Sequence, residues 1–170
     1  IPENIKNGYV VIVVGAKHNT KKIPPQKIID LIEKLKYPTI LIGGKEEVYE
    51  ASYIIQNIKY PFVLNFCGKL TLHDSAIIIK DSKAVVTPDT GMMHIAAAFK
   101  KNIISLWGNT VPEFGMYPYM PGEKSKIFEV KNLKCRPCSK LGFKKCPHKH
   151  FKCMTDINTD EIVEYLKNII

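Results

Sequence analysis

Long apolar runs and strong compositional bias are both missing from this sequence of 170 residues. No stretch approaches the roughly 18 apolar residues that a membrane-spanning helix needs, so we expect no such helix. The chain has no signal-peptide pattern and starts at Ile1 rather than Met, so we expect a fragment. Hydrophobic residues make up 45% and charged residues 24%, which excludes a wholly disordered chain, a coiled coil and a collagen-like fibre.

Two widespread nucleotide-binding motifs are absent as well. The sequence contains no G-x-x-x-x-G-K-[ST] phosphate loop and no G-x-G-x-x-G fingerprint. A P-loop NTPase and an ordinary dehydrogenase are therefore disfavoured. A nucleotide-binding site in this chain would have to use other residues than these two motifs.

Short apolar segments alternate with segments of helical periodicity. The unbroken apolar run 9–14 is typical of a strand that is covered on both faces. Thr71 and Asp74 form a capping pair at the start of a helix. The pattern predicts strands at 9–14, 39–42, 62–66, 84–87, 103–107 and 127–130, and helices at 24–35, 46–58, 71–79, 91–99 and 159–169. We expect an α/β fold, with a doubly wound, Rossmann-like parallel sheet and helices on both faces, as one domain over residues 1–170.

Polar residues follow the predicted strands at the edge where such sheets bind ligands. Asp89, Thr90 and Gly91 lie at a strand-to-helix turn, where the amide groups of a helix N-terminus favour a phosphate. Alternatively, Asp89 or Thr90 only caps the helix and Gly91 only allows close packing. His94 shares a helix face with Gly91, although a lone histidine is more often structural.

Charged residues follow the first two predicted strands. Lys21 and Lys22 are placed to reach phosphate oxygens, or else they belong to a solvated basic loop. Glu46 is placed to accept hydrogen bonds from a ribose, or else it only favours the first turn of its helix. The residues alone leave both alternatives open.

Five segments, taken together, resemble one known family. Residues 89–98 resemble the D-[ST]-G-x-x-H-[LI]-x-A-A signature of glycosyltransferase family 9, which includes the lipopolysaccharide heptosyltransferases. Residues 14–24 are similar to its G-A-x-x-x-T-K-R-W-P loop, with Ile in place of Trp at position 23. Residues 43–46, 67–72 and 106–112 resemble its G-G-x-E, G-K-[TL]-[ST]-L and L-[FW]-G-x-T-x-P elements.

The resemblance implies the C-terminal, donor-binding half of a GT-B glycosyltransferase. The N-terminal domain of the family, which holds the acceptor and the general base, is expected to be absent from this chain. We therefore expect the chain alone to bind a nucleotide-sugar donor weakly and to be inactive. The implied activity is the transfer of heptose from ADP-heptose, with inversion and without a metal cofactor, to a lipid-linked acceptor of the lipopolysaccharide core. The implied location is cytoplasmic.

The resemblance also implies roles for individual residues. Lys21 and Asp89 are the expected catalytic residues: Lys21 would neutralise the diphosphate and Asp89 would hydrogen-bond sugar hydroxyls. Glu46 would contact the nucleoside, and the amides of Thr90 and Gly91 would hold the outer phosphate. Lys22 and His94 complete the expected substrate-binding set.

Four of the five cysteines lie in a basic segment, residues 133–153. Residues 123–153 contain ten Lys or Arg and two acidic residues, a net charge of +8. A C-x-x-C pair with two further cysteines suggests a structural zinc site more than disulfides, although the spacing of the four is irregular for a zinc ribbon. Disulfides and reduced thiols are the alternatives. The candidate ligands are Cys135, Cys138, Cys146 and Cys153. The fifth cysteine, Cys67, lies in an apolar run and is expected to be a buried free thiol.

A non-enzymatic alternative uses this basic segment. A zinc-stabilised basic module would bind nucleic acid or anionic lipid. Nucleic acid is disfavoured because the aromatic residues available for base stacking there are few, mainly Phe143 and Phe151. In an enzyme, the same segment would permit peripheral contact with the anionic inner face of the cytoplasmic membrane.

Overall fold

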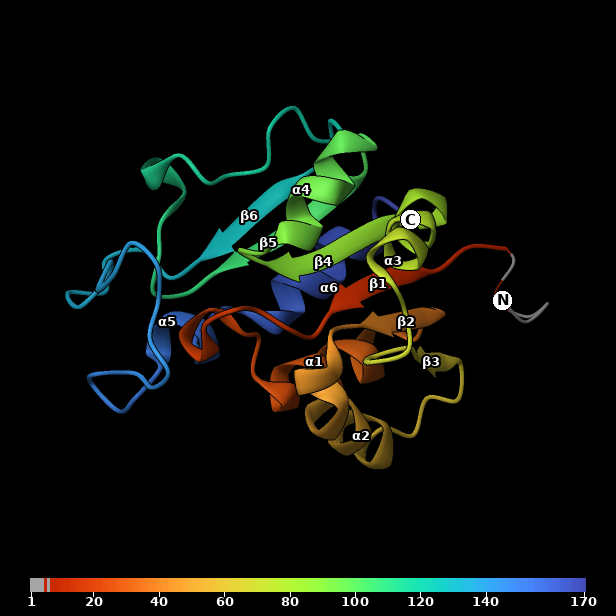
Figure 1. Cartoon of the computed structure of the whole chain (residues 1–170), viewed down its shortest axis with the longest axis horizontal. Helices are drawn as coiled ribbons and strands as arrows, with labels where there is room; N and C mark the ends of the chain where they lie inside the picture. The colour runs from red at the N-terminus through yellow and green to blue at the C-terminus, as the bar shows by residue number, and fades with distance from the viewer. Residues whose placement is uncertain (1–4, 6) are drawn as a thin grey trace.

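The computed structural model describes residue 5 and residues 7–170 (Figure 1). Within that part of the chain, one six-stranded sheet is formed, and all neighbouring strands are parallel. The strand order is β3-β2-β1-β4-β5-β6. The strands are β1 (Val10–Val13), β2 (Thr39–Ile42), β3 (Val63–Asn65), β4 (Ala84–Pro88), β5 (Asn102–Trp107) and β6 (Lys126–Glu129). The predicted doubly wound, Rossmann-like sheet is confirmed.

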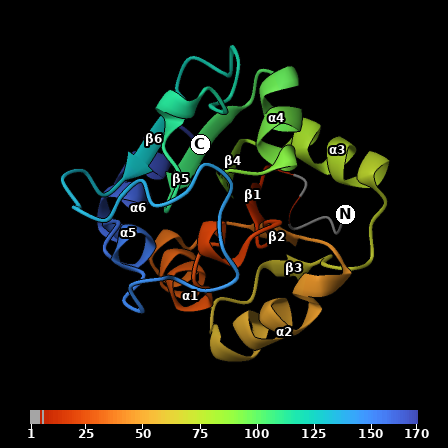
Figure 2. The ribbon, with the colours of Figure 1, turned by 60° about the vertical axis from the view of Figure 1, so that its left-hand side comes forward.

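Helices cover both faces of the sheet, as Figure 2 shows. One face packs against α1 (Pro25–Leu35), α2 (Val48–Asn57), α5 (Lys152–Thr155) and α6 (Thr159–Lys167). The other face packs against α3 (Leu72–Asp81) and α4 (Gly91–Ala98). Among the described residues, no helix is both long and apolar enough to cross a membrane.

Strand β1 shows why the central strands are apolar throughout. Val10 and Ile12 belong to the core under α1, whereas Val11 and Val13 belong to the core under α3 and α4. Successive side chains of a strand point to opposite faces, and both faces are covered by helices here. An unbroken apolar run is therefore what this position in the sheet requires.

The predicted helix starts agree with the structure. Pro25 occupies the first turn of α1, where its missing N–H costs nothing. Thr71 and Asp74 form a reciprocal capping box at α3. The side chain of Asn158 accepts hydrogen bonds from the amides of Asp160 and Glu161 at the start of α6.

The structure differs from the sequence prediction at several boundaries and in one additional helix. Most ends shift by one or two residues, as from 62–66 to Val63–Asn65 at β3. The helix expected at 46–58 is a short 3-10 turn, Lys45–Glu47, followed by α2. The terminal helix ends at Lys167 rather than at 169. Helix α5 was not predicted, because four residues are too few to show a helical period.

The order of the strands fixes where a ligand can bind. The connection after β1 leads to β2 on one side, whereas the connection after β4 leads to β5 on the other side. The loops that follow β1 and β4 therefore diverge and open a crevice at the carboxyl ends of the strands. The predicted site residues Lys21, Lys22, Glu46 and 89–91 belong to the segments that follow β1, β2 and β4.

Candidate functional site

An open cavity of about 480 Å³ lies at the carboxyl ends of β1, β2 and β4. It is lined by Val13 and by residues 15–17, 43–47 and 90–92. Glu46, Thr90 and Gly91, three of the predicted site residues, are therefore brought together although they are far apart in the sequence. The position agrees with the crevice expected for a doubly wound sheet.

The N-terminus of α4 forms one wall of this cavity. Thr90 is the N-cap residue, and its hydroxyl accepts a hydrogen bond of 3.2 Å from the amide of Met92. A Cβ atom built on Gly91 would have no other atom within 4 Å, so this glycine faces open space rather than a packed neighbour. The capping interpretation is thus confirmed for Thr90, whereas Gly91 is not a packing glycine. The positive end of α4 is accessible to an anion.

Lys21 and Asp89 form a buried ion pair beside the cavity. Lys21 Nζ lies 2.6 Å from Asp89 Oδ2, and the two side chains are only 10% and 6% exposed. Thr110 donates a further hydrogen bond of 3.3 Å to the same carboxylate oxygen. The 3-10 turn Asn19–Lys21 and the end of β4 supply the two partners. Neither side chain lines the cavity, but Asp89 directly precedes Thr90, which does.

A second charged group contains Glu47, which the sequence analysis missed. Glu47 is buried, accepts a 2.8 Å hydrogen bond from the amide of Gly44 and forms a 3.0 Å ion pair with Lys22. A Cβ on Gly15 would lie 2.5 Å from the carboxyl carbon of Glu47, so a larger residue there would have to displace that carboxylate. The sequence signal was the Gly44-x-x-Glu47 spacing, which supplies one half of a capping box: the Glu47 carboxylate accepts the amide of Gly44.

The carboxylates of Glu47 and Glu50 stabilise the charged form of Lys22. Burial by itself would lower the pKa of Lys22, but hydrogen bonds and attraction from the two carboxylates outweigh it and raise that pKa. Lys22 is therefore held by Glu47 at the rim of the site. Glu46, by contrast, is exposed and lines the cavity.

His94, a predicted binding residue, lies on α4 with its side chain exposed. Like Lys21, Lys22 and Asp89, it is not among the residues that line the cavity. Only the first residues of α4 belong to that lining, so the separation of three residues from Gly91 does not bring His94 into it.

The cysteine segment (residues 133–153) lies next to the loop after β1. Thr20 donates its amide to the carbonyl of Phe143, and its hydroxyl accepts the amide of Phe143 at 2.8 Å. Arg136 donates to the carbonyl oxygens of Gly108 and Thr110 and pairs with Glu129 at 2.6 Å. These contacts hold the cysteine segment against the loop that follows β1 and the loop that follows β5. Thr20 directly precedes Lys21, a predicted catalytic residue.

Cys135, Cys138, Cys146 and Cys153, here called the cysteine cluster, line one small enclosed cavity. All are free thiols. Burial, together with the neighbouring thiols, raises the pKa of Cys138 and raises that of Cys153 to about 11. Over the residues described, however, no group of three or more His, Cys, Asp or Glu side chains is already arranged to hold a metal ion. Cys67, as expected, is a buried free thiol.

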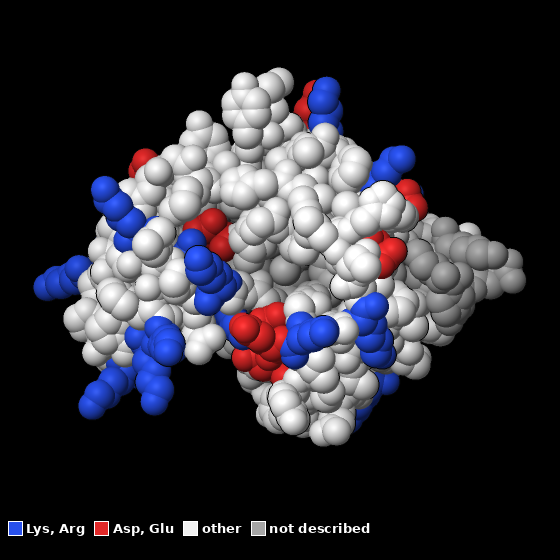
Figure 3. Space-filling view, viewed as in Figure 1, with Lys and Arg blue, Asp and Glu red and all other residues white. Residues whose placement is uncertain are grey.

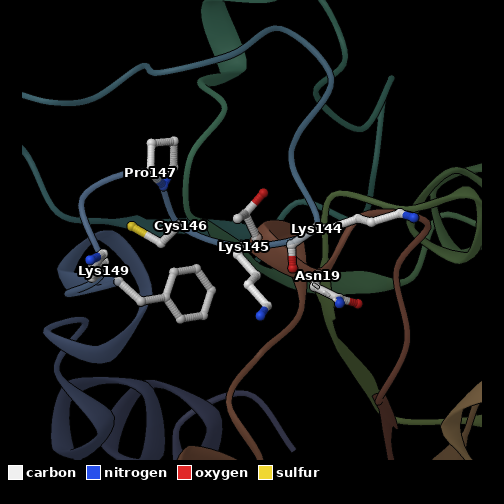
Figure 4. A pocket seen from close by; sticks show the side chains of 8 residues that line it. Asn19, Lys144, Lys145, Cys146, Pro147 and Lys149 are labelled. Atoms are coloured by element: carbon white, nitrogen blue, oxygen red, sulfur yellow. Dashed lines mark hydrogen bonds between the residues drawn. The ribbon is translucent and has the colours of Figure 1, made fainter.

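The outer side of the cysteine segment is basic. Figure 3 shows Lys and Arg side chains at the end of the molecule that the 133–153 loops form in Figure 1. An open pocket of about 540 Å³ lies there, lined in part by Asn19, Lys144, Lys145 and Lys149. In Figure 4 the ends of Lys144 and Lys145 point apart. The lysines therefore do not converge on one anion, so the strand-edge cavity is the stronger site candidate even though it is slightly smaller.

The geometry agrees with comparisons to known proteins. The chain is 33% identical over 115 residues to the Lipooligosaccharide heptosyltransferase 2 of Campylobacter jejuni, which covers 68% of this chain and 33% of the relative. The structure of E. coli ADP-heptose lps heptosyltransferase II has the same fold, with a TM-score of 0.76, 20% identity, and coverage of 99% of this chain and 52% of that chain.

A further solved structure, E. coli heptosyltransferase WaaC with ADP, matches with a TM-score of 0.70 and 21% identity, over 100% of this chain and 46% of that one. The chain thus spans about a third of the curated relative and about half of each solved chain. The family model named glycosyltransferase family 9 (heptosyltransferase) matches residues 2–152. On this match over most of its length, the chain belongs to glycosyltransferase family 9.

Proposed function

We propose that this chain is the donor-binding half of a glycosyltransferase that transfers heptose from ADP-heptose to an acceptor of the lipopolysaccharide core. The observation that carries the proposal is the cavity at the open N-terminus of α4, beside the Lys21–Asp89 pair. Family membership supports the reaction class. The named ligand of the WaaC structure, ADP, supports the choice of nucleotide.

In this proposal the diphosphate lies against Thr90 and Gly91. Negative charge builds on the departing ADP as the bond to the anomeric carbon breaks. The acceptor hydroxyl oxygen forms the new bond on the opposite face of the sugar, which inverts the anomeric centre, and its proton passes to a base. Amide groups and the Lys21 ammonium, fixed in advance by the fold, stabilise the charge on the leaving group without a metal ion.

Lys21 must exchange partners when the donor binds. Its ammonium donates a hydrogen bond to Asp89 in this structure, so a phosphate oxygen would take the place of the carboxylate. Asp89 would then be free to accept hydrogen bonds from sugar hydroxyls, while Thr110 keeps it in position. Glu46, which lines the cavity and is exposed, would accept hydrogen bonds from the nucleoside.

The remaining parts of the reaction belong outside this chain. Because the chain spans about a third of its curated relative, we place the acceptor site and the general base on an N-terminal domain. We propose a cytoplasmic enzyme whose basic cysteine segment faces the anionic inner leaflet. Liposome binding that is unchanged after neutralisation of Lys144, Lys145 and Lys149 would contradict the membrane contact.

Calorimetric titration of ADP, UDP and GDP tests the donor site. We expect ADP to bind most tightly and Lys21→Ala to weaken it about 10- to 100-fold, because a hydrogen bond to a charged group is worth about 1.5–3 kcal/mol. Lys167→Ala, at the distant end of α6, is the matched control and should leave ADP binding unchanged. Equal affinity of wild type and Lys21→Ala for ADP would refute the phosphate role.

A further inference from the structure

The cysteine cluster surrounds an enclosed cavity and does not lie on an open surface. The cavity between the cysteine segment and the ends of the sheet is lined by all four thiols, together with Asn109, His148 and His150. The ligands come from two sides: three thiols from the irregular segment and Cys153 from the first turn of α5. No function of the donor cavity uses these groups.

Asn109 supplies an independent sign that a group is bound there. Its side chain is 1% exposed and lines the same cavity. Within the described part of the chain, neither its Nδ2 nor its Oδ1 has a hydrogen-bond partner. Buried amides are almost always paired, so an unpaired one needs an explanation. A thiolate sulfur in the cavity would accept the Nδ2 proton.

His150 is oriented as a hydrogen-bond donor to the cluster. Its Nδ1 accepts the amide of Lys152 at 3.0 Å, so the proton of the neutral ring is on Nε2. That nitrogen lies 3.7 Å from the sulfur of Cys135. His150 is thus not free to act as a ligand through Nε2; it supports a sulfur that carries negative charge.

We propose that the cysteine cluster binds one structural zinc ion as a tetrathiolate. Binding releases four thiol protons to solvent and leaves a zinc–thiolate group with a formal charge of −2, with no change of oxidation state. Four sulfurs at about 2.3 Å in a tetrahedron are a common closed structural site for zinc. The ten Lys or Arg of residues 123–153 offset the negative charge.

The thiols are not yet at ligand positions, so zinc must draw them together. Residues 131–151 contain no helix or strand, and their three thiols are only partly buried, so no regular hydrogen-bonded structure has to be broken for them to move. The hydrogen bonds between Thr20 and Phe143 keep the segment in place while this occurs. Zinc binding of this kind stabilises a segment that has little core of its own.

Elemental analysis by mass spectrometry tests the proposal on the complete protein, purified without metal-affinity resin. We expect one zinc ion per chain in the wild type and in the control Cys67→Ala, whose thiol lies outside the cluster. Cys138→Ser and Cys146→Ser should lose the metal. Asn109→Ala should keep it but bind about 10-fold more weakly, whereas Asn57→Ala, on the exposed face of α2, should match the wild type.

A second measurement uses only the wild-type protein, so its result does not depend on whether the cysteine variants fold. Chelator-treated wild-type protein is titrated with Co²⁺, and the visible spectrum of a tetrahedral thiolate site is expected at one equivalent. Absence of zinc together with a failure to bind Co²⁺ overturns the proposal. A disulfide between cluster cysteines in freshly purified protein also overturns it, and iron lost from the same variants refutes the choice of zinc.

Discussion

The strand-edge cavity and the cysteine segment are built on different principles. The cavity is formed by backbone at the ends of β1, β2 and β4, and the register of the sheet fixes it. The cysteine segment has almost no regular structure and is fixed by individual contacts of Arg136 and Thr20. The first is therefore held by the backbone hydrogen bonds of the sheet, whereas the second depends on a few side chains.

Asp89→Asn tests the strand-edge cavity and has the largest expected effect. The carboxylate would be lost while the shape is kept, so the transfer rate of the complete enzyme should fall about 10²- to 10³-fold. Asp160→Asn, at a surface ion pair with Lys34, is the control. Thermal unfolding should be measured as well, because Lys21 would be left buried without its partner. A rate within twofold of wild type would remove Asp89 from the mechanism.

Thr20→Val breaks the connection between the two regions. It removes the hydroxyl that pairs with the backbone of Phe143 and leaves that amide without its partner. We expect a loss of about 1–2 kcal/mol in the free energy of unfolding, together with weaker ADP binding because Lys21 is the next residue. Thr155→Val, whose hydroxyl is exposed on α5, should cost less. ADP binding that is unaffected by Thr20→Val would show that the two regions are independent.

Cys67 lies beside Gly43 of the cavity, and its ionisation makes the stability of this region depend on pH. Burial, with a smaller contribution from Glu47, raises the pKa of this thiol from 9.0 to about 12. Above pH 9 the unfolded chain ionises Cys67 while the folded chain keeps its proton, so stability falls as pH rises toward 12. The expected loss is about 1 kcal/mol between pH 9 and pH 10. Urea unfolding of Cys67→Ala should lack that part of the decline; an identical pH slope would contradict the assignment.

Gly91→Ala is the smallest expected effect and separates ligand binding from folding. The added methyl group meets no atom of the protein, so the folded state should lose no stability. It would occupy the approach to the α4 amides, whose interaction with an anion is worth about 0.3–1 kcal/mol. We expect ADP to bind roughly two- to fivefold more weakly with an unchanged melting temperature. A drop in melting temperature would instead indicate a packing role for Gly91.

Sequence reasoning worked where local pattern and global fold agree. The apolar run at 10–13 and the capping box of Thr71 depend on residues that are neighbours in the sequence. The strand and the helix start could therefore be predicted from these segments alone. The resemblance implied separate roles for Lys21 and Asp89, but their ion pair was not predicted, since 68 residues separate the partners. Asn109 was missed because its importance lies in burial and in tertiary neighbours, which no spacing rule encodes. For Glu47, the spacing from Gly44 indicates a helix start but not the ion pair with Lys22.

In this structure the Lys21 ammonium and the Asp89 carboxylate neutralise each other. An inorganic anion would gain little there, because it must displace a carboxylate that is already buried and well oriented. In the proposed donor site, a ligand that brings both a diphosphate for the ammonium and hydroxyl groups for the carboxylate would satisfy the two separated charges together. Selectivity against small cellular anions would then follow from the competition between the Asp89 carboxylate and the ligand for Lys21.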